Sequence, residues 1–476
     1  NYRLFKMVVG DIEEGTDLLV IGAGPGGYTA AIRAAQKGLD VVLVDKEEVG
    51  GVCLNRGCIP AKSLIHAAGF QEDIQHWEEI GIHTENLEVD FQEVQEWKNN
   101  VIDRLTGGVK QLLDAQGVEY KKGEAFFQDS ETVRIDMEHN AETIKFENAI
   151  IATGSQPTEL PGFEFDKDKI ISSRELLNLE EVPDEIVVIG GGYIGMEAVT
   201  KFCKFGSTVK VLEVRDRVLA NFDEDLVSEI QEVSECYNDE IYTNTEAKEL
   251  EYRNDKAVVK ADQDGEEIEI EGDRILVSVG RTVKPTIEGL NIENTDVELD
   301  ENGFVKTDQQ MKTTDENVYA IGDIAGQPML AHKAYREGKV AAEAVAGEPA
   351  AFDNQYIPKV TYTDPEIAVV GLDPAEAKEQ HGEVKIGKFP FSASGRALTT
   401  NHEDGFIRVV ASKDDKILGV QIIGPRASDM IAEATLALEM QAYLDDVANT
   451  IHAHPTFPEA FAEACEDALN KSIHTG

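Results

Sequence analysis

The sequence predicts an α/β protein with two parallel-sheet units, because one pattern of strand, glycine turn, helix and strand occurs twice in the chain. In the first copy, an apolar run at 18–21 leads into three glycines, and an alanine-rich helix follows them. These glycines, in G-x-G-x-x-G spacing, are Gly22, Gly24 and Gly27. A second apolar run at 41–44 ends in Asp45, which completes the order of elements seen in a Rossmann-like fold.

The second copy of the pattern lies near the middle of the chain, in EIVVIGGGYIGMEAVTKFCKFGSTVKVLEVRDR. Its glycines are Gly190, Gly192 and Gly195. Glu213 follows its second strand at the same distance from the first glycine as Asp45 in the first copy. A single G-x-G-x-x-G is weak evidence, because many are plain glycine turns. Two copies with strand, helix and acidic residue all in place predict two dinucleotide sites.

Each part of the fingerprint has a physical role. The first glycine makes the tight turn, the second lets a pyrophosphate approach the backbone, and the third allows close packing of helix on strand. The acidic residue accepts hydrogen bonds from ribose hydroxyls. Glu213 would repel a 2′-phosphate, so the second site is expected to prefer NAD(H) over NADP(H). Arg215 and Arg217 follow closely and leave some NADP(H) binding open.

The chain is strongly acidic. Among 476 residues, 91 are Asp or Glu and 44 are Lys or Arg, which gives a formal net charge of −47. Such a surface repels nucleic acids and anionic membranes, so no partner of either kind is expected. The excess is spread along the chain and indicates adaptation to molar salt, where self-repulsion is screened. The alternative is an acidic protein that is indifferent to salt.

Two of the five cysteines, Cys53 and Cys58, lie close together in GGVCLNRGCIPAK. Their spacing does not fit an ordinary zinc site and the other cysteines are scattered, so no metal site is predicted. The N-terminal stretch lacks a signal-peptide core, and no apolar run is long enough to cross a membrane. We therefore expect a cytoplasmic protein in a reducing compartment, where a close cysteine pair is more often redox-active than structural.

The order of these motifs resembles the pyridine-nucleotide disulfide oxidoreductase family over nearly the whole chain. After the first fingerprint and the cysteine pair come IIATGSQP (150–157), the second fingerprint, VGR (279–281), VYAIGDIAG (318–326), VTYTDPEIAVVG (360–371) and HAHPTFPEAFAEA (452–464). The resemblance implies FAD at the first fingerprint and NAD at the second. It also implies a homodimer that oxidises protein-bound dihydrolipoamide on a lipoyl-bearing protein, with NAD⁺ as acceptor.

The same resemblance implies a domain plan. The FAD-binding domain would be discontinuous, comprising 1–152 and 282–350, with an NAD-binding domain at 153–281 inserted in it. An α+β interface domain at 351–476 would build the homodimer. Further cofactor-binding residues by resemblance are Ala125, Thr153, Gly154, Asp323 and Ala331 on the FAD side, and Glu197 and Gly280 near the NAD side.

For catalysis, the resemblance implies that Cys58 faces the flavin and that Cys53 is the more accessible thiol, which exchanges with substrate. The cysteine segment is expected to be a distorted helix start, because its glycines and Pro60 permit irregular backbone. Lys62 would lie near the flavin, with Glu197 as its partner.

The thiol exchange also needs a base, and by resemblance this is His454, oriented by Glu459 and supplied by the second subunit. His452 is the rival for this role, but its position relative to the following proline does not match the family motif.

The chain departs from the family pattern at several positions. Arg56 stands between the cysteines, Asp45 replaces a glutamate, and Phe457 and Pro458 replace Leu-Ser before Glu459. VGRTVKPT also lacks the usual Gly-Arg-x-Pro-Asn run.

Alternative functions are a glutathione-reductase-like enzyme, disfavoured by Glu213, and a non-catalytic redox sensor or scaffold. Mercuric reductase is disfavoured by the lack of a C-terminal cysteine pair, and a soluble transhydrogenase by the presence of both redox cysteines.

Overall fold

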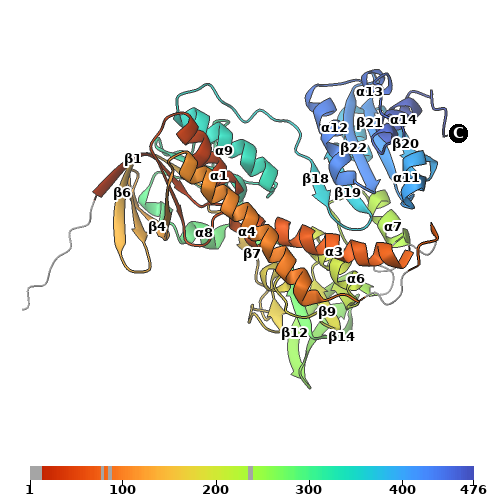
Figure 1. The fold of residues 1–476 in the computed structure, drawn as a ribbon, viewed down its shortest axis with the longest axis horizontal. Helices are drawn as coiled ribbons and strands as arrows, with labels where there is room; N and C mark the ends of the chain where they lie inside the picture. The colour runs from red at the N-terminus through yellow and green to blue at the C-terminus, as the bar shows by residue number, and fades with distance from the viewer. Residues whose placement is uncertain (1–12, 77–79, 84–87, 234–239, 476) are drawn as a thin grey trace, which may run out of the picture. The chain divides into compact units, whose positions relative to one another are not determined.

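The computed structural model describes residues 13–76, 80–83, 88–233 and 240–475 (Figure 1). The chain forms two compact units. The first comprises Asn1–Ser63, Gln95–Thr158 and Arg281–Asp353. The second comprises Leu64–Val94, Glu159–Gly280 and Asn354–Gly476. The first unit contains most of the predicted FAD-binding segments, and the proposed boundaries of the three domains stay a prediction.

The first unit is built on a seven-stranded sheet with the order β3-β2-β1-β6-β5-β4, in which β17 also pairs with β6. The strands are β1 (Glu13–Ile21), β2 (Val41–Asp45), β3 (Glu119–Lys122), β4 (Glu124–Asp129), β5 (Thr132–Asp136), β6 (Ala141–Ile151) and β17 (Val318–Ala320). Its β3-β2-β1-β6 part and the β6–β17 pair are parallel. The strands predicted at 18–21 and 41–44 are confirmed as parts of β1 and β2.

The helices and short elements of the first unit carry several of the predicted site residues. They are α1 (Pro25–Gln36), α2 (Gly51–Arg56), β7 (Gln156–Pro157), β16 (Arg281–Thr282), α8 (Lys284–Glu288), η3 (Ile292–Asn294), η4 (Gly322–Ala325) and α9 (Ala331–Val345). Helices α3 (Cys58–His76) and α4 (Phe91–Ala115) each contribute residues to both units. Helices α1 and α9 pack together at Gly26 and Gly338, where a Cβ on Gly338 would lie 2.5 Å from the Gly26 carbonyl oxygen.

The second unit contains a fully parallel five-stranded sheet with the order β11-β10-β9-β15-β8. Its strands are β8 (Ile170–Ile171), β9 (Glu185–Ile189), β10 (Thr208–Leu212), β11 (Ile241–Tyr242) and β15 (Arg274–Val277). Helices α5 (Ser173–Leu176), α6 (Tyr193–Lys204) and α7 (Glu224–Val233) belong to this region. An antiparallel sheet is formed by β12 (Thr245–Arg253), β13 (Lys256–Gln263) and β14 (Glu266–Gly272).

The C-terminal part of the second unit is an antiparallel sheet with the order β18-β19-β22-β21-β20. The strands are β18 (Lys359–Thr361), β19 (Glu366–Gly371), β20 (Val384–Pro390), β21 (Phe406–Ser412) and β22 (Ile417–Gly424). The helices are α10 (Pro374–His381), η5 (Phe391–Ala393), α11 (Gly395–Thr400), α12 (Ala427–Glu439), α13 (Leu444–Ala448) and α14 (Glu459–Ala468).

Helices α12 and α14 share one buried apolar core with this sheet. Gly387 permits the close approach of α14, because a Cβ there would lie 2.0 Å from the Ala464 carbonyl oxygen. The predicted α/β fold with parallel sheets and an α+β C-terminal part is therefore confirmed.

Candidate active site and cofactor-binding sites

The first fingerprint forms the tight turn that its glycines predict. Gly22 has φ +107°, and a Cβ on it would lie 2.3 Å from the Ala152 carbonyl oxygen. A Cβ on Gly27 would lie 1.7 Å from the Gly22 carbonyl oxygen, so the third glycine is required for the helix to approach the turn. Gly24 is the N-cap of α1 and offers no capping side chain. The first backbone N–H groups of α1 thus have no side-chain acceptor at the cap, as a phosphate-binding helix requires.

Asp45 fastens this turn to the end of β2. Its Oδ2 accepts a hydrogen bond from the Ala23 N–H at 2.5 Å, and its Oδ1 accepts one from the Glu47 N–H at 2.7 Å. Burial raises the pKa of Asp45, and the two backbone donors partly offset that rise. The sequence predicted only a contact with ribose; the structure adds a role in holding the glycine turn.

The second fingerprint repeats this geometry in the second unit. Gly190 has φ +104°, and a Cβ on it would lie 2.8 Å from the Ser278 carbonyl oxygen. A Cβ on Gly195 would lie 2.2 Å from the Gly190 carbonyl oxygen, while Gly192 caps α6 with no side chain.

Glu213 is buried and holds the second glycine turn as Asp45 holds the first. Its Oε2 accepts from the Gly191 N–H at 2.7 Å, and its Oε1 accepts from the Arg215 N–H at 2.9 Å. The equal spacing in sequence therefore reflects the same local structure.

The cysteine pair lies directly beside the first fingerprint. Gly51, the first residue of α2, has φ +57°, and a Cβ on it would lie 2.6 Å from the Gly24 Cα. The Gly50 N–H also donates to the Ala23 carbonyl oxygen at 2.8 Å. The start of α2 is thereby pressed against the turn that is expected to hold the dinucleotide phosphates.

The predicted distorted helix is confirmed as a break between two helices. Gly57 separates α2 from α3 with φ −145° and ψ −111°. Cys53 lies in α2 and is half-buried, whereas Cys58 is the first residue of α3 and is exposed in this chain. The order of accessibility in the single chain is therefore the reverse of the expected one, in which Cys53 is the more accessible thiol. Neither sulfur is part of a disulfide.

The two thiols interact with each other and with nearby charges. A hydrogen bond to Cys58, followed by burial and the charge of Cys58, raises the pKa of Cys53. The positive charge of Lys62 opposes this rise in pKa, and the negative charge of Asp323 adds to it. The protonation of Cys53 therefore depends on Cys58, and the two thiols titrate as a pair.

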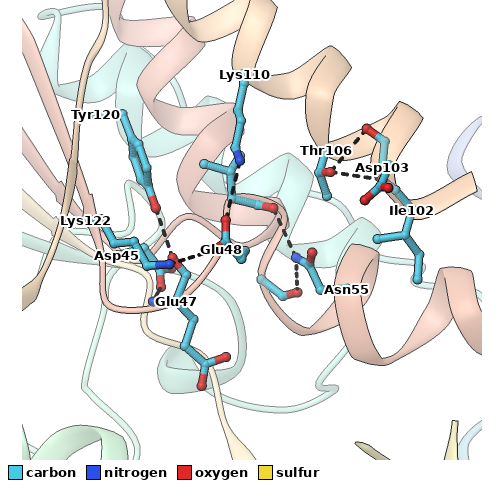
Figure 2. Close-up of polar contacts among 12 residues, drawn as sticks. Asp45, Glu47, Glu48, Asn55, Ile102, Asp103, Thr106, Lys110, Tyr120 and Lys122 are labelled. Carbon is cyan, nitrogen blue, oxygen red and sulfur yellow. Dashed lines mark hydrogen bonds and ion pairs between the residues drawn. The ribbon is translucent and has the colours of Figure 1, made fainter. Parts of the chain in front are cut away.

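Polar side chains anchor the segment between Asp45 and the cysteines (Figure 2). The Asn55 amide donates to the carbonyl oxygens of Val49 and Gly51 at 3.0 and 2.9 Å. The Tyr120 hydroxyl donates to the Glu47 carbonyl oxygen at 3.0 Å, as Figure 2 shows. Sequence reasoning missed these contacts, since each joins groups through loop geometry rather than through a motif.

Arg56, the cationic departure from the family pattern, forms an ion pair with Glu47. Its charge is therefore partly neutralised, and Lys62 is the cation whose charge opposes the rise in the pKa of Cys53.

A tyrosine pair was also missed by sequence reasoning. The hydroxyl groups of Tyr28 in α1 and Tyr335 in α9 are hydrogen-bonded at 2.7 Å, with the rings edge to face. Burial raises the pKa of both phenols, and the charge of Cys53 adds to this effect for each. The pair therefore stands near the redox cysteines as a neutral polar group.

The remaining residues predicted to bind FAD lie in the first unit. Thr153 and Gly154 follow β6, and Gly154 has φ +67°. Ala125 is buried in β4, Ala331 is the first residue of α9, and Asp323 lies in η4. The Thr153 hydroxyl oxygen is buried with no hydrogen-bond partner among the described residues, which fits a polar ligand at this point. The glycine cradle and this unpaired hydroxyl both suit a dinucleotide.

His454 and Glu459 form the predicted pair. The His454 Nδ1 lies 2.8 Å from Glu459 Oε1, and the His454 side chain is 79% exposed. Glu459 begins α14, and its Oε2 accepts from the Thr456 N–H at 2.6 Å. With Nδ1 directed to the carboxylate, Nε2 is the ring nitrogen available to take a proton.

The Phe-Pro replacement before Glu459 does not break this pair. Phe457 is buried and its ring packs edge to face against Phe391. The side chain thus anchors the turn that presents Glu459.

His452, the rival base, is already engaged through both ring nitrogens. Its Nε2 lies 2.9 Å from Glu433 Oε1, and its Nδ1 lies 3.0 Å from the Thr450 carbonyl oxygen. The His452 side chain is only 9% exposed, so it is less accessible to a substrate than His454.

Glu197 is buried in α6, where its Oε1 accepts from the Tyr362 N–H at 3.2 Å. Lys62 belongs to the other unit, so their pairing stays a prediction. Gly280 follows β15 in the sequence and has φ +131°.

Among the described residues, no three His, Cys, Asp or Glu side chains are grouped to hold a metal ion. In the same part of the chain, no helix has the length and apolarity needed to cross a membrane.

These features define a class of flavin-dependent disulfide enzymes, and comparison with known proteins agrees. Residues 16–338 match the family described as pyridine nucleotide-disulphide oxidoreductase, and residues 357–465 match its dimerisation domain. The chain belongs to the pyridine nucleotide-disulphide oxidoreductase family.

Two named relatives are similar to this chain over nearly its whole length. Dihydrolipoyl dehydrogenase of Halobacterium salinarum is 48% identical over 474 residues, which cover 98% of this chain and 99% of the relative. Dihydrolipoyl dehydrogenase of Bacillus subtilis is 48% identical over 470 residues, with 98% and 99% coverage. The crystal structure of LpdA from Mycobacterium tuberculosis has a TM-score of 0.87 at 23% identity, covering 94% of this chain and 99% of that one. That likeness concerns the fold alone.

Proposed function

We propose that this protein is a dihydrolipoyl dehydrogenase, which oxidises protein-bound dihydrolipoamide to lipoamide with FAD as prosthetic group and NAD⁺ as final acceptor. The observation that carries this proposal is the contact between Gly51 and Gly24, which sets the start of the cysteine helix against the first fingerprint turn. Relatives with this name, matched over almost their full length, support the same substrate.

Proton transfer starts the reaction. The His454 Nε2 takes the proton from one substrate thiol, while Glu459 holds Nδ1 and stabilises the resulting imidazolium. The substrate thiolate attacks Cys53 Sγ in the oxidised pair, so the Cys53–Cys58 bond breaks and Cys58 leaves as a thiolate. In this order of steps, Cys53 exchanges with the substrate thiol and Cys58 keeps the negative charge.

The second substrate thiol then attacks the substrate sulfur joined to Cys53. The cyclic disulfide of lipoamide forms, and Cys53 leaves and takes up the second proton. The raised pKa of Cys53 supports the protonated form of Cys53 in this end state. When bound, FAD supplies the chemistry that accepts two electrons from the cysteine pair and passes a hydride to nicotinamide.

The residues for both cofactors are proposed as follows. FAD would be held by the first fingerprint, Asp45, Thr153, Gly154, Asp323, Ala125 and Ala331, with Lys62 near its ring. NAD(H) would be held by the second fingerprint, Glu213 and Gly280. The Glu213 carboxylate supports NAD(H) over NADP(H), because a 2′-phosphate would meet a buried negative charge.

The matched dimerisation domain supports a homodimer. In that domain, several large apolar side chains are exposed in the single chain: Leu436, Met440, Tyr443 and Ile451. We propose that a second copy covers them and that His454 acts on the cysteine pair of that second copy. A lipoyl-bearing protein is the proposed substrate partner.

A steady-state assay in molar KCl tests the activity. Dihydrolipoamide with NAD⁺ is compared with glutathione disulfide with NADPH, each with the purified holoenzyme. Turnover of the first pair and little turnover of the second is expected; the opposite preference would contradict the proposal and favour a glutathione-reductase-like enzyme.

A further inference from the structure

A buried ion pair in α9 holds the turn that carries Asp323. Glu337 and Lys333 are 3% and 7% exposed, and Glu337 Oε1 lies 2.8 Å from the Lys333 Nζ. Their spacing places both on one face of the helix, one turn apart. Taking two charges out of water is costly, so a buried pair of this kind is weak evidence for added stability and suggests a role in fixing local geometry.

The ion pair bonds to the backbone at both ends of η4. Glu337 Oε2 accepts from the Gly322 N–H at 2.7 Å. The Lys333 Nζ donates to the carbonyl oxygens of Gly326 at 3.1 Å and Gly322 at 3.4 Å. Gly322 and Gly326 have φ +77° and +125°, so both ends of the turn consist of the most permissive residue. The ion pair therefore restrains the two positions of the turn that have the greatest conformational freedom.

A second set of bonds orients the Asp323 side chain itself. The Arg281 Nε donates to Ser155 Oγ, and its guanidinium also donates to the Ser155 carbonyl oxygen, both at 2.7 Å. Since Ser155 Oγ accepts from Arg281, its own hydrogen is directed to Asp323 Oδ2. The backbone and the side chain of Asp323 are therefore each held by a separate group of residues.

We propose that Lys333 and Glu337 are positioning residues, which fix η4 so that the Asp323 carboxylate meets the ribityl hydroxyls of FAD. This inference rests on the proposed function, because it takes FAD as the ligand. Neither residue touches the ligand in this account; both act through Asp323. Burial raises the pKa of Glu337, and the charge of Lys333 and the Gly322 N–H oppose that rise, which agrees with a carboxylate dependent on its partners.

The test measures the FAD dissociation constant of the full-length protein by flavin fluorescence, in molar KCl. Glu337→Gln keeps the side-chain shape but leaves the Lys333 charge without its partner, so FAD is expected to bind at least about tenfold more weakly. Glu343→Gln is the matched control, because Glu343 lies on the same helix and pairs with Arg33 nearer the surface. Its FAD affinity is expected to match that of the unaltered protein.

A double-mutant cycle separates positioning from a general structural effect. If Glu337 acts through Asp323, the Glu337→Gln change costs much less FAD affinity in an Asp323→Asn background than alone. Equal costs in both backgrounds would overturn the inference. Ser155→Ala is a second, milder variant that is expected to fold; it removes only the donor to Asp323 and is also expected to weaken FAD binding.

A failure of the proposed function and a failure of this inference give different results. If the unaltered protein binds no FAD, the proposed function falls and this inference falls with it. If the unaltered protein binds FAD and Glu337→Gln binds it equally well, only this inference is overturned.

Discussion

At the residue scale, the raised pKa of Cys53 predicts which thiol reacts. The thiolate is the nucleophile, so a thiol that keeps its proton reacts slowly with an alkylating reagent. Cys58→Ser removes the hydrogen bond and charge that raise the pKa of Cys53. A lower pKa increases the thiolate fraction at fixed pH, so iodoacetamide should label Cys53 faster at pH 8 in this variant than in the reduced parent. Mass spectrometry of the labelled peptide measures the rate, and an unchanged rate would contradict the interaction.

The base is tested by comparing two histidines that have the same kind of partner. His454→Gln is expected to lower dihydrolipoamide turnover by about 100-fold or more, because it removes the proton acceptor. His474→Gln is the matched control: His474 also pairs with a glutamate through Nδ1, at 2.7 Å from Glu463, and is exposed. Turnover near the parent rate is expected for it. Equal losses in both variants would argue against a specific role for His454.

At the scale of elements, the contact between α2 and the first fingerprint predicts an effect of Gly51→Ala. The added Cβ would meet Gly24 and would also place alanine at φ +57°, so the cysteine helix has to move. Gly38→Ala is the control, because Gly38 has φ +90° with open space around it. The conformational strain of about 1–2 kcal/mol is common to both, and the clash belongs to Gly51→Ala alone.

FAD content and thermal midpoint measure the outcome. Gly51→Ala is expected to lose both bound flavin and stability, and Gly38→Ala only a modest part of its stability. If the two variants retained the same flavin content, the close contact would not matter for cofactor binding.

The elements of the fold were more predictable than the contacts between them. The fingerprints and the cysteine helix each lie within one short segment, so their spacing carries the information. The His454–Glu459 pair was expected only from the resemblance to the family. Ser155, Tyr335 and Asn55 gave no such signal. Ser155 and Tyr335 bond to residues far away in the chain, and Asn55 bonds to backbone carbonyl groups, which any sequence supplies. Only the folded structure brings these groups together.

At the scale of the whole molecule, the net charge of −47 predicts a dependence on salt. At about 1 M salt the Debye length is about 3 Å, so repulsion between surface carboxylates is screened, whereas at low salt it favours expansion. The thermal midpoint measured by circular dichroism is therefore expected to fall steadily as KCl is diluted from molar to millimolar concentration. A midpoint that does not change with salt would contradict salt adaptation.

The central claim is that the Cys53–Cys58 pair relays electrons between a dithiol and a nicotinamide through flavin. Its most direct test is anaerobic mixing of the holoenzyme with dihydrolipoamide in molar KCl, followed by NAD⁺, while flavin absorbance is recorded. The account predicts that absorbance changes on adding dithiol, returns on adding NAD⁺, and does not change with dithiol in Cys53→Ser. Flavin reduction by dihydrolipoamide that persists in Cys53→Ser would contradict it.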